Sequence, residues 1–291
     1  MRALRLGAAG LLVALAMAAC GGGAQSAGGG GSGSGSDLLA QVKDRGTLIA
    51  STDPAYPPQS FQTKTGEYKG FDIDVVTEIA RRLGVKVEFV TPSWDAITAG
   101  SWGGRWDISV GSMTITPERK KVLLFSPPYY YTPASAAVHE ENTTITDPAT
   151  DLDGKKIGVC GACSYEAYLK KDLKLPGEKV NYVIDNAQIQ TYDTDTTAIQ
   201  DLALGDGVRL DAVLSALPTL QEAIQNGKPI KIIGDPLYYE PLAAAMDKSS
   251  PTDPTAFHQK VSQIIQQMHK DGTLSRLSKK WYDGTDLTVK Q

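Results

Sequence analysis

The segment from Gly111 to Arg119 reads Gly-Ser-Met-Thr-Ile-Thr-Pro-Glu-Arg and combines hydroxyl side chains with a cation. Thr116 is a favoured N-cap residue and Pro117 a favoured first helical residue, so a helix is predicted over 117–121. Arg119 then lies in the first turn, where the helix dipole disfavours a cation by about a few tenths of a kcal/mol. A partner that stabilises Arg119 is therefore expected.

Two partners for Arg119 are compatible with this segment. Glu118 can form a surface ion pair with it, which is a purely structural role. Alternatively, the guanidinium binds an anion and offers a bidentate fork to a carboxylate, while Ser112 and Thr114 complete the cradle with hydroxyl and backbone N–H groups. The second interpretation makes this segment a carboxylate-binding site.

Cys160 and Cys163 form a Cys-Gly-Ala-Cys motif between a predicted strand and a predicted helix. A redox-active pair occurs in this context. The motif nevertheless lies in the middle of a long α/β pattern, and not near the start of a small thioredoxin-like domain. We therefore predict a structural disulfide that closes a tight loop in an oxidising compartment, with a redox catalyst as the alternative.

Other residue patterns give no catalytic or metal site. The chain has three histidines, none of them beside a nucleophile motif or paired at ligand spacing, so hydrolase and zinc chemistry have no basis. Residues 193–195 (Asp-Thr-Asp) lack the Gly and Glu of a calcium loop and are predicted to form a loop and a helix cap. The net charge of −4 and the absence of a basic stripe exclude nucleic acid as a partner. No cofactor or metal is predicted.

The N-terminal segment predicts export and anchoring. Residues 1–19 have the form of a signal peptide, because Arg2 and Arg5 precede an apolar run too short for a membrane-spanning helix of about 20 residues. The sequence Leu-Ala-Met-Ala-Ala-Cys, which ends at Cys20, resembles a bacterial lipoprotein cleavage site and makes this cysteine the lipidated N-terminus. The alternative is an ordinary signal peptide with an incidental cysteine. Residues 21–36 are almost entirely Gly, Ser and Ala and are expected to form a flexible tether.

From residue 37 onward, short β-rich runs alternate with helical patterns, which predicts an α/β fold. Three prolines predict a loop over 53–58, because proline lacks a backbone donor. Predicted strands cover 48–50, 85–90, 107–110, 134–138, 155–159, 180–184, 211–214, 230–233 and 242–245, and a hairpin covers 59–71. Predicted helices cover 73–83, 117–121, 165–172, 194–204, 218–226, 255–270 and 274–281.

The stretch Gly-Phe-Asp-Ile-Asp-Val-Val over 70–76, followed by Ile79-Ala80 and Leu83, resembles the signature of family 3 extracellular solute-binding proteins. These are the polar amino-acid receptors of ABC importers. The resemblance continues in the family's order through 53–58, 93–97, 116–119, 125–130 and 271–282. It covers essentially all of residues 37–291.

The resemblance implies a two-lobed α/β fold of the type II periplasmic-binding-protein kind, with the ligand in the cleft between the lobes. Lobe 1 is expected to comprise 37–132 and 240–291, and lobe 2 to comprise 133–239. The implied function is an extracytoplasmic lipoprotein on the outer face of the bacterial cell membrane that binds a small carboxylate-bearing solute, an amino acid or a similar compound, by hinge closure. The expected partners are an ABC permease and its ATPase, the protein itself being a monomer whose only membrane contact is the lipid.

The resemblance also implies a set of ligand-binding residues. They are Asp53, Tyr56, Trp94, Gly111, Ser112, Thr114, Arg119, Cys163, Ser164 and Glu240. Arg119 is expected to bind the ligand's α-carboxylate, and the two aromatic residues to sandwich its side chain unless they are core residues. The Asp that binds the ammonium group in this family is replaced by Ala216, so Glu240, Asp53 or an aromatic face supplies that site, or the ligand is not a standard α-amino acid.

Two other functions remain open. Some relatives of this fold are enzymes, such as cyclohexadienyl dehydratases, and Asp53 or Glu240 can provide the general acid that a dehydratase requires. A redox role for the Cys-x-x-Cys motif is the third possibility.

Overall fold

The computed structural model describes residues 37–290. The predicted signal peptide, the lipidated Cys20 and the tether up to residue 36 lie outside the described residues. Within the described part of the chain, no helix has both the length and the apolar character needed to cross a membrane.

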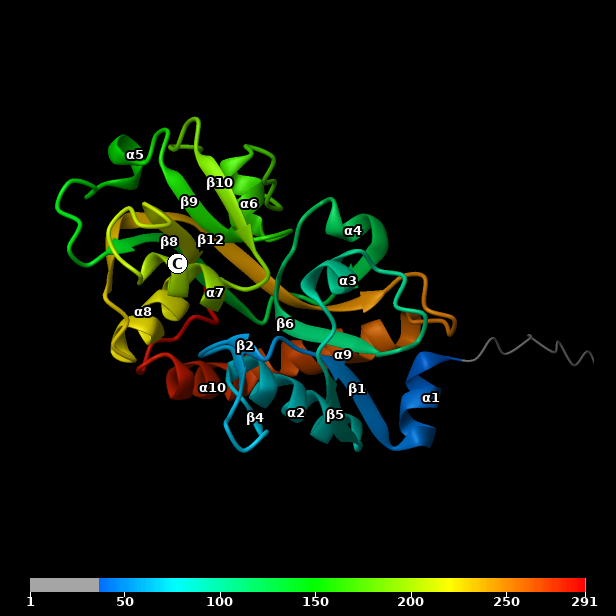
Figure 1. The fold of residues 1–291 in the computed structure, drawn as a ribbon. Helices are drawn as coiled ribbons and strands as arrows, with labels where there is room; N and C mark the ends of the chain where they lie inside the picture. The colour runs from blue at the N-terminus through cyan, green and yellow to red at the C-terminus, as the bar shows by residue number, and fades with distance from the viewer. Residues whose placement is uncertain (1–36, 291) are drawn as a thin grey trace, which may run out of the picture. The chain divides into compact units, whose positions relative to one another are not determined.

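The described residues form an α/β structure, as predicted (Figure 1). The helices are α1 (Leu38–Arg45), α2 (Phe71–Leu83), α3 (Trp94–Thr98), α4 (Arg119–Val122), α5 (Pro148–Asp151), α6 (Ser164–Leu169), α7 (Asp195–Leu202), α8 (Leu217–Gln225), α9 (Thr255–Lys270) and α10 (Thr273–Trp281). The strands are β1 (Thr47–Ser51), β2 (Ala55–Tyr56), β3 (Ser60–Gln62), β4 (Tyr68–Lys69), β5 (Lys86–Val90), β6 (Ile108–Thr114), β7 (Leu123–Phe125), β8 (Tyr130–His139), β9 (Lys156–Cys160), β10 (Gln188–Tyr192), β11 (Ala212–Ala216) and β12 (Ile230–Asp247).

Two long strands organise the main sheet, whose order is β10-β9-β11-β8-β12-β6-β1-β5 with β7 paired to β12. Strands β8 and β12 are antiparallel neighbours along most of their length, and their register shifts between Ile233 and Tyr238. In Figure 1, β12 runs from the group that contains β9 and β10 to the group that contains β6 and β1. The two strands therefore connect the two halves of the sheet.

The buried apolar residues divide into two sets along the chain. The clusters around α2, α9 and β1, and around Trp102 and Trp106, draw on residues between 38 and 130 and between 242 and 287. The clusters around β9, β11 and α6 draw on residues between 134 and 238. We call these two sets the first and the second lobe. The exact lobe limits stay a prediction: 37–132 with 240–291 for the first lobe and 133–239 for the second. In the structure, Thr132 of β8 pairs with Glu240 of β12.

Local sequence signals account for several of these elements. Helix α9 has the predicted bounds. Helix α2 ends at Leu83, directly before Gly84, whose φ of 78° is the left-handed conformation that glycine adopts without a steric penalty. The side chains of α2 that recur at helical spacing, among them Ile73, Val76 and Ile79, are buried, and the helix packs against β5 and β6 as an amphipathic helix requires.

One local prediction is wrong, and two others are confirmed only in part. Residues 180–184 form no strand. Their apolar side chains pack against the core of the second lobe, and β10 is the strand that pairs with β9. The segments 230–233 and 242–245 belong to the single strand β12. The proline-rich loop contains the two-residue strand β2, which pairs with β3 at the edge of a separate three-stranded sheet, where a proline-rich segment can be accommodated.

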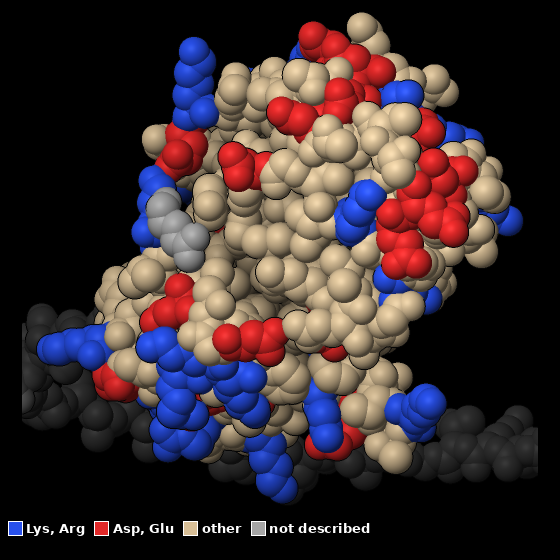
Figure 2. Space-filling view, turned by 90° about the vertical axis from the view of Figure 1, so that its left-hand side faces the viewer, with Lys and Arg blue, Asp and Glu red and all other residues tan. Residues whose placement is uncertain are grey.

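The surface in Figure 2 carries charges of both signs. Lys and Arg side chains gather toward the lower left of this face, and Asp and Glu side chains gather toward the upper right. This face therefore carries both signs of charge, and the net charge of the chain is −4.

Candidate ligand pocket

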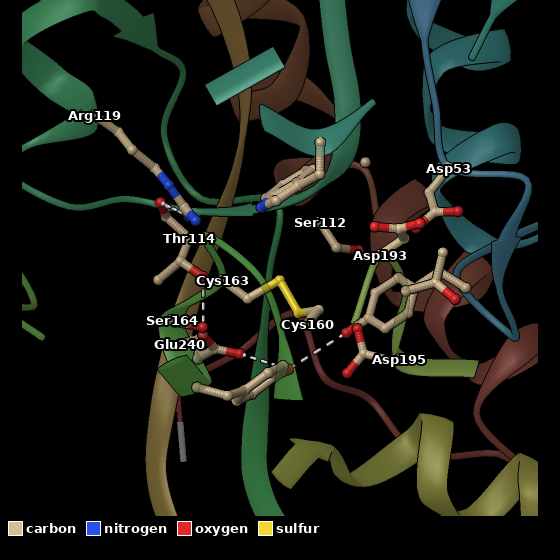
Figure 3. Close-up of a pocket in the computed structure, with 15 residues that line it drawn as sticks. Asp53, Ser112, Thr114, Arg119, Cys160, Cys163, Ser164, Asp193, Asp195 and Glu240 are labelled. Carbon is tan, nitrogen blue, oxygen red and sulfur yellow. Dashed lines mark hydrogen bonds between the residues drawn. A yellow bond between two sulfur atoms is a disulfide. The ribbon is translucent and has the colours of Figure 1, made fainter. Parts of the chain in front are cut away.

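One pocket brings together residues of both lobes (Figure 3). It is lined by Asp53, Tyr56, Trp94, Gly111, Ser112, Thr114, Arg119, Cys160, Cys163, Ser164, Tyr165, Asp193, Thr194, Asp195 and Glu240. All ten residues predicted to bind ligand are among them, and so is Cys160. The sequence analysis missed the pocket position of Tyr165 and of residues 193–195, which it interpreted only as a loop and helix cap.

The pocket walls are mostly strand ends and helix starts. The first lobe contributes the β1–β2 connection, the start of α3, strand β6 and the start of α4; the second lobe contributes the β9–α6 loop and the β10–α7 loop, and β12 runs between them. Such edges carry side chains and backbone groups that no neighbouring strand or helix turn satisfies, so they are suited to binding polar solutes.

Arg119 is buried in the pocket wall. Its Nη1 donates to the carbonyl of Thr114 at 3.0 Å and its Nη2 to the carbonyl of Ala162, across the pocket, at 2.9 Å. Thr116 caps the turn, since its hydroxyl accepts from the Arg119 N–H at 3.2 Å. Glu118 pairs with the exposed Lys121 instead, so the surface pair proposed for Arg119 is not formed. Burial lowers the pKa of Arg119 to about 10, which still leaves it charged at neutral pH.

Trp94 lies beside this guanidinium. The Arg119 Cζ atom is 5.3 Å from the centroid of the indole ring, within the range of a cation–π interaction. The indole Nε1 donates to the Ala162 carbonyl at 3.3 Å. Tyr56 lies elsewhere in the pocket, with its hydroxyl 3.4 Å from that of Tyr165. The two residues predicted to sandwich the ligand side chain therefore contact protein side chains in this structure: Trp94 contacts Arg119, and Tyr56 contacts Tyr165.

Glu240 accepts hydrogen bonds from hydroxyl groups of both lobes. Its carboxylate accepts hydrogen bonds from Thr114 Oγ1 at 2.9 Å, from Tyr165 at 3.1 Å and from Ser164. Burial raises the pKa of Glu240, while these hydrogen bonds and the nearby Arg119 act in the opposite direction. Thr114, expected to assist a ligand carboxylate, and Ser164, expected to bind ligand, thus donate their hydroxyl groups to Glu240 in this structure.

Asp72 holds Ser112, a residue of strand β6 that lines the pocket. Ser112 has a φ of 53°, an uncommon left-handed conformation for a residue with a side chain. Its hydroxyl donates to Asp72 at 2.7 Å, and its N–H donates to the Tyr129 hydroxyl, which in turn donates to Asp72 at 2.7 Å. The sequence analysis included Asp72 only in the Gly-Phe-Asp motif, and its spacing gave no signal for this contact.

Acidic residues outnumber basic ones in the pocket. Among the fifteen lining residues, Asp53, Asp193, Asp195 and Glu240 are acidic and Arg119 alone is basic. Figure 3 shows Arg119 on one side and the three aspartates on the opposite side. Burial raises the pKa of Asp53, and raises that of Asp195 to about 7. The pocket therefore has a cationic and an anionic pole.

The predicted disulfide between Cys160 and Cys163 is present, with the Cα atoms 5.6 Å apart. The two sulfur atoms and an Asp195 carboxylate oxygen lie within 4.8 Å of one another, which is close enough to share a metal ion. Metal coordination by cysteine requires thiolates, and the disulfide leaves none. The oxidised site is therefore no metal site.

The buried acids predict that stability falls as the pH rises. Burial raises the pKa of Asp72 from 3.8 to about 7, so between about pH 4 and 7 the folded chain holds a proton that the unfolded chain has released. The contribution of this group to the free energy of unfolding therefore decreases through that window and is constant above it. Urea unfolding is expected to give a lower free energy at pH 8 than at pH 5.

The variant Asp72→Asn tests this assignment. It should lose roughly 1–3 kcal/mol at pH 5, because an amide nitrogen cannot accept the bond from Ser112 or Tyr129. The loss should be smaller at pH 8, where the wild type carries the buried charge. An equal loss at both pH values would show that Asp72 does not titrate in this range.

A polar pocket between two α/β lobes joined by long strands defines the class of two-lobed solute-binding proteins. Comparison with known sequences agrees: residues 48–284 match the bacterial extracellular solute-binding proteins, family 3. The chain therefore belongs to this family.

Relatives in the family bind amino acids. The L-cystine-binding protein TcyJ of Escherichia coli (strain K12) is 32% identical over 252 residues, which cover 86% of this chain and 88% of that protein. The crystal structure of an ancestral amino acid-binding protein, described as a precursor of cyclohexadienyl dehydratase, has a TM-score of 0.71 at 34% identity and covers 84% of this chain and 100% of its own. An ancestral arginine-binding protein bound to arginine has a TM-score of 0.70 at 33% identity, and the match covers 82% of this chain and 99% of that protein.

Proposed function

We propose that the chain is the substrate-binding lipoprotein of an ABC importer and binds a small carboxylate-bearing solute in the pocket between its lobes. The observation that carries the proposal is the buried Arg119 at the pocket wall. A guanidinium has five N–H donors, and the described contacts of Arg119 use its Nη1 and Nη2 once each, on two carbonyls. Donors remain for a solute carboxylate that enters the pocket.

The proposed location is the outer face of the cell membrane, with Cys20 as the lipid anchor and an ABC permease and its ATPase as partners. The extracellular character of the family and the signal-like N-terminal sequence support this location. We propose a monomer without a cofactor, whose lobe limits are those predicted from the sequence.

The solute is proposed to carry a cation as well as a carboxylate. Four acidic residues and one arginine line the pocket, so a purely anionic solute would add repulsion at the pole of the three aspartates. A solute with an ammonium or guanidinium group supplies the missing positive charge. A relative that binds L-cystine and a structural neighbour bound to arginine have ligands that combine both kinds of group.

Asp195 is the proposed partner of that cation. The family's usual ammonium-binding position is Ala216, at the end of β11. The preceding residue, Ser215, donates its hydroxyl to Asp195 at 2.6 Å, so a carboxylate from the start of α7 lies beside the position where the usual one is missing. Asp195 is only 7% exposed, and the bond from Ser215 is the one hydrogen bond that its carboxylate makes with another described residue.

Closure of the lobes is the proposed mechanism. A solute that contacts Arg119 from the first lobe and Asp195 from the second favours the closed arrangement by its difference in affinity for the two forms. Strands β8 and β12 connect the lobes and are the proposed hinge. The closed form is the one that a permease would recognise.

A thermal-shift screen tests the ligand class. Cationic amino acids, cystine, neutral amino acids, betaines and dicarboxylates are each added to the purified chain, and ligands that bind the folded state raise the melting temperature according to concentration and affinity. Cationic amino acids or cystine are expected to give the largest shift. A shift with dicarboxylates alone would contradict the proposed cation site.

The dehydratase function is the second candidate. A structural neighbour described as a precursor of cyclohexadienyl dehydratase favours it, and the buried acid Glu240 is a possible proton donor because burial raises its pKa. Incubation with prephenate or arogenate, followed by spectroscopic detection of the aromatic product, tests for dehydratase activity. Turnover by the wild type that is lost in Glu240→Gln would show that the chain is an enzyme and would contradict the proposed binding function.

A further inference from the structure

The disulfide loop of residues 160–163 is part of the contact between the two lobes. The loop joins β9 to α6, and both cysteines line the ligand pocket. Between them, Ala162 has a φ of 56°, an uncommon left-handed conformation for a residue with a side chain, so the surrounding loop must stabilise it. The cross-link between the two ends of the loop is one such constraint.

The Ala162 carbonyl accepts two hydrogen bonds from the first lobe. One comes from Arg119 Nη2 at 2.9 Å and the other from Trp94 Nε1 at 3.3 Å. On the other side of the same residue, the Ala162 N–H donates to Glu166 of α6 at 2.7 Å. The loop is thus held to its own lobe by α6 and contacts the other lobe through one carbonyl.

Reduction would change the shape of this loop. Breaking the S–S bond forces the two sulfur atoms from bonding distance to van der Waals separation, within a site that already holds the Asp195 carboxylate within 4.8 Å. Cys160 is 2% exposed and lies at the end of a paired strand, whereas Cys163 is half-buried at the start of a short helix. The displacement therefore falls mainly on Cys163 and on the adjacent Ala162.

The loop is accessible to a reductant through Cys163. This residue lines the ligand pocket and also a second hollow, formed by residues such as Thr116, Ala167 and Lys174, that lies beside the first. A thiolate that attacks the Cys163 sulfur forms a mixed disulfide and releases the Cys160 sulfur, which takes up a proton. The second thiol of a dithiol then displaces Cys163, so two electrons and two protons pass to the protein and the dithiol becomes a disulfide.

We propose that Cys160–Cys163 is a thiol–disulfide exchange site whose oxidation state controls solute affinity: the disulfide holds the Ala162 carbonyl in contact with Arg119 and Trp94, and reduction by a dithiol releases it. The closed form loses two hydrogen bonds between the lobes on reduction and becomes less populated. Solute affinity therefore falls, because binding must then supply the free energy of closure. The effect on affinity rests on the proposed solute-binding function.

The test compares oxidised and reduced protein with two readouts. The full chain carrying Cys20→Ser is used, so that titratable thiols report only on the pair: none are expected without reductant and two after dithiothreitol. Hydrogen exchange of the amides over 160–167 is expected to accelerate at least about fivefold on reduction, and calorimetric affinity for the solute found in the screen is expected to fall at least about fivefold, the lower end of common coupling between sites.

The double variant Cys160→Ser/Cys163→Ser is the matched control. Its hydrogen exchange and solute affinity should equal those of the reduced protein and should not change on addition of dithiothreitol. Two free thiols before reduction, unchanged exchange, or faster exchange with unchanged affinity would each overturn the proposal. If neither form binds any solute, the proposed function fails, and hydrogen exchange still decides whether the disulfide controls the loop.

Discussion

The variant Arg119→Ala is expected to abolish measurable solute binding while the chain remains folded. The side chain is buried, is the one basic residue that lines the pocket, and is proposed to bind the solute carboxylate. Loss of charge-assisted hydrogen bonds worth about 3 kcal/mol or more lowers affinity at least about a hundredfold. Calorimetry with the solute found in the screen measures the affinity, and circular dichroism checks the fold.

Two control variants separate the roles of charge, geometry and local structure. Arg119→Lys keeps the charge and loses the planar fork, so an intermediate affinity is expected. Lys121→Ala removes an exposed cation from the same short helix, where it pairs with Glu118, and should leave affinity unchanged. Unchanged affinity in Arg119→Ala would refute the carboxylate assignment.

The variant Asp195→Asn is expected to lower affinity for a cationic solute at least about tenfold, because it removes the buried negative charge at the anionic pole. It should also remove most of the pH dependence of binding. Two acidic residues of the pocket, Asp53 and Glu240, also raise the pKa of Asp195, and the hydrogen bond from the Ser215 hydroxyl lowers it. Burial is the largest cause of a pKa near 7.

The direction of the pH effect follows from this pKa. A bound cation favours the ionised carboxylate, so binding releases a proton below about pH 7. Wild-type affinity should therefore rise from pH 6 to 8 and level off above. Asp193→Asn is the matched control, since Asp193 lines the same pocket two residues earlier but is exposed, and it should retain the rise. A rise that persists in Asp195→Asn would assign the titration to another group.

The parts of the site that sequence reasoning found are those encoded locally. Thr116, Pro117 and Arg119 lie in one turn, so capping preferences and the helix dipole already indicated an arginine in need of a partner. Cys160 and Cys163 are three residues apart, and a strand before them and a helix after them predicted the tight loop that their disulfide closes. Each inference uses residues that are neighbours in the chain.

The parts that sequence reasoning missed depend on contacts between distant residues. Asp72 holds Ser112, forty residues away, and Asp195 lies against Ser215, twenty residues away. Nothing in the local pattern distinguishes these aspartates from Asp193, which is exposed. The apolar run at 180–184 was misassigned for the same reason, because burial under a lobe and pairing in a sheet give similar patterns.

The sequence by itself determined the α/β class, the resemblance to the family, the candidate carboxylate-binding arginine and the cysteine pair, since these follow from hydrophobic period, capping chemistry and motif order. Only the tertiary structure decided that four acids and one arginine line one pocket, that Asp195 bonds to Ser215, the neighbour of Ala216 in the chain, and that the Ala162 carbonyl contacts the other lobe. The physical reason is that charge balance and burial are properties of a site built from both lobes. They exist only once β8 and β12 bring the two lobes together.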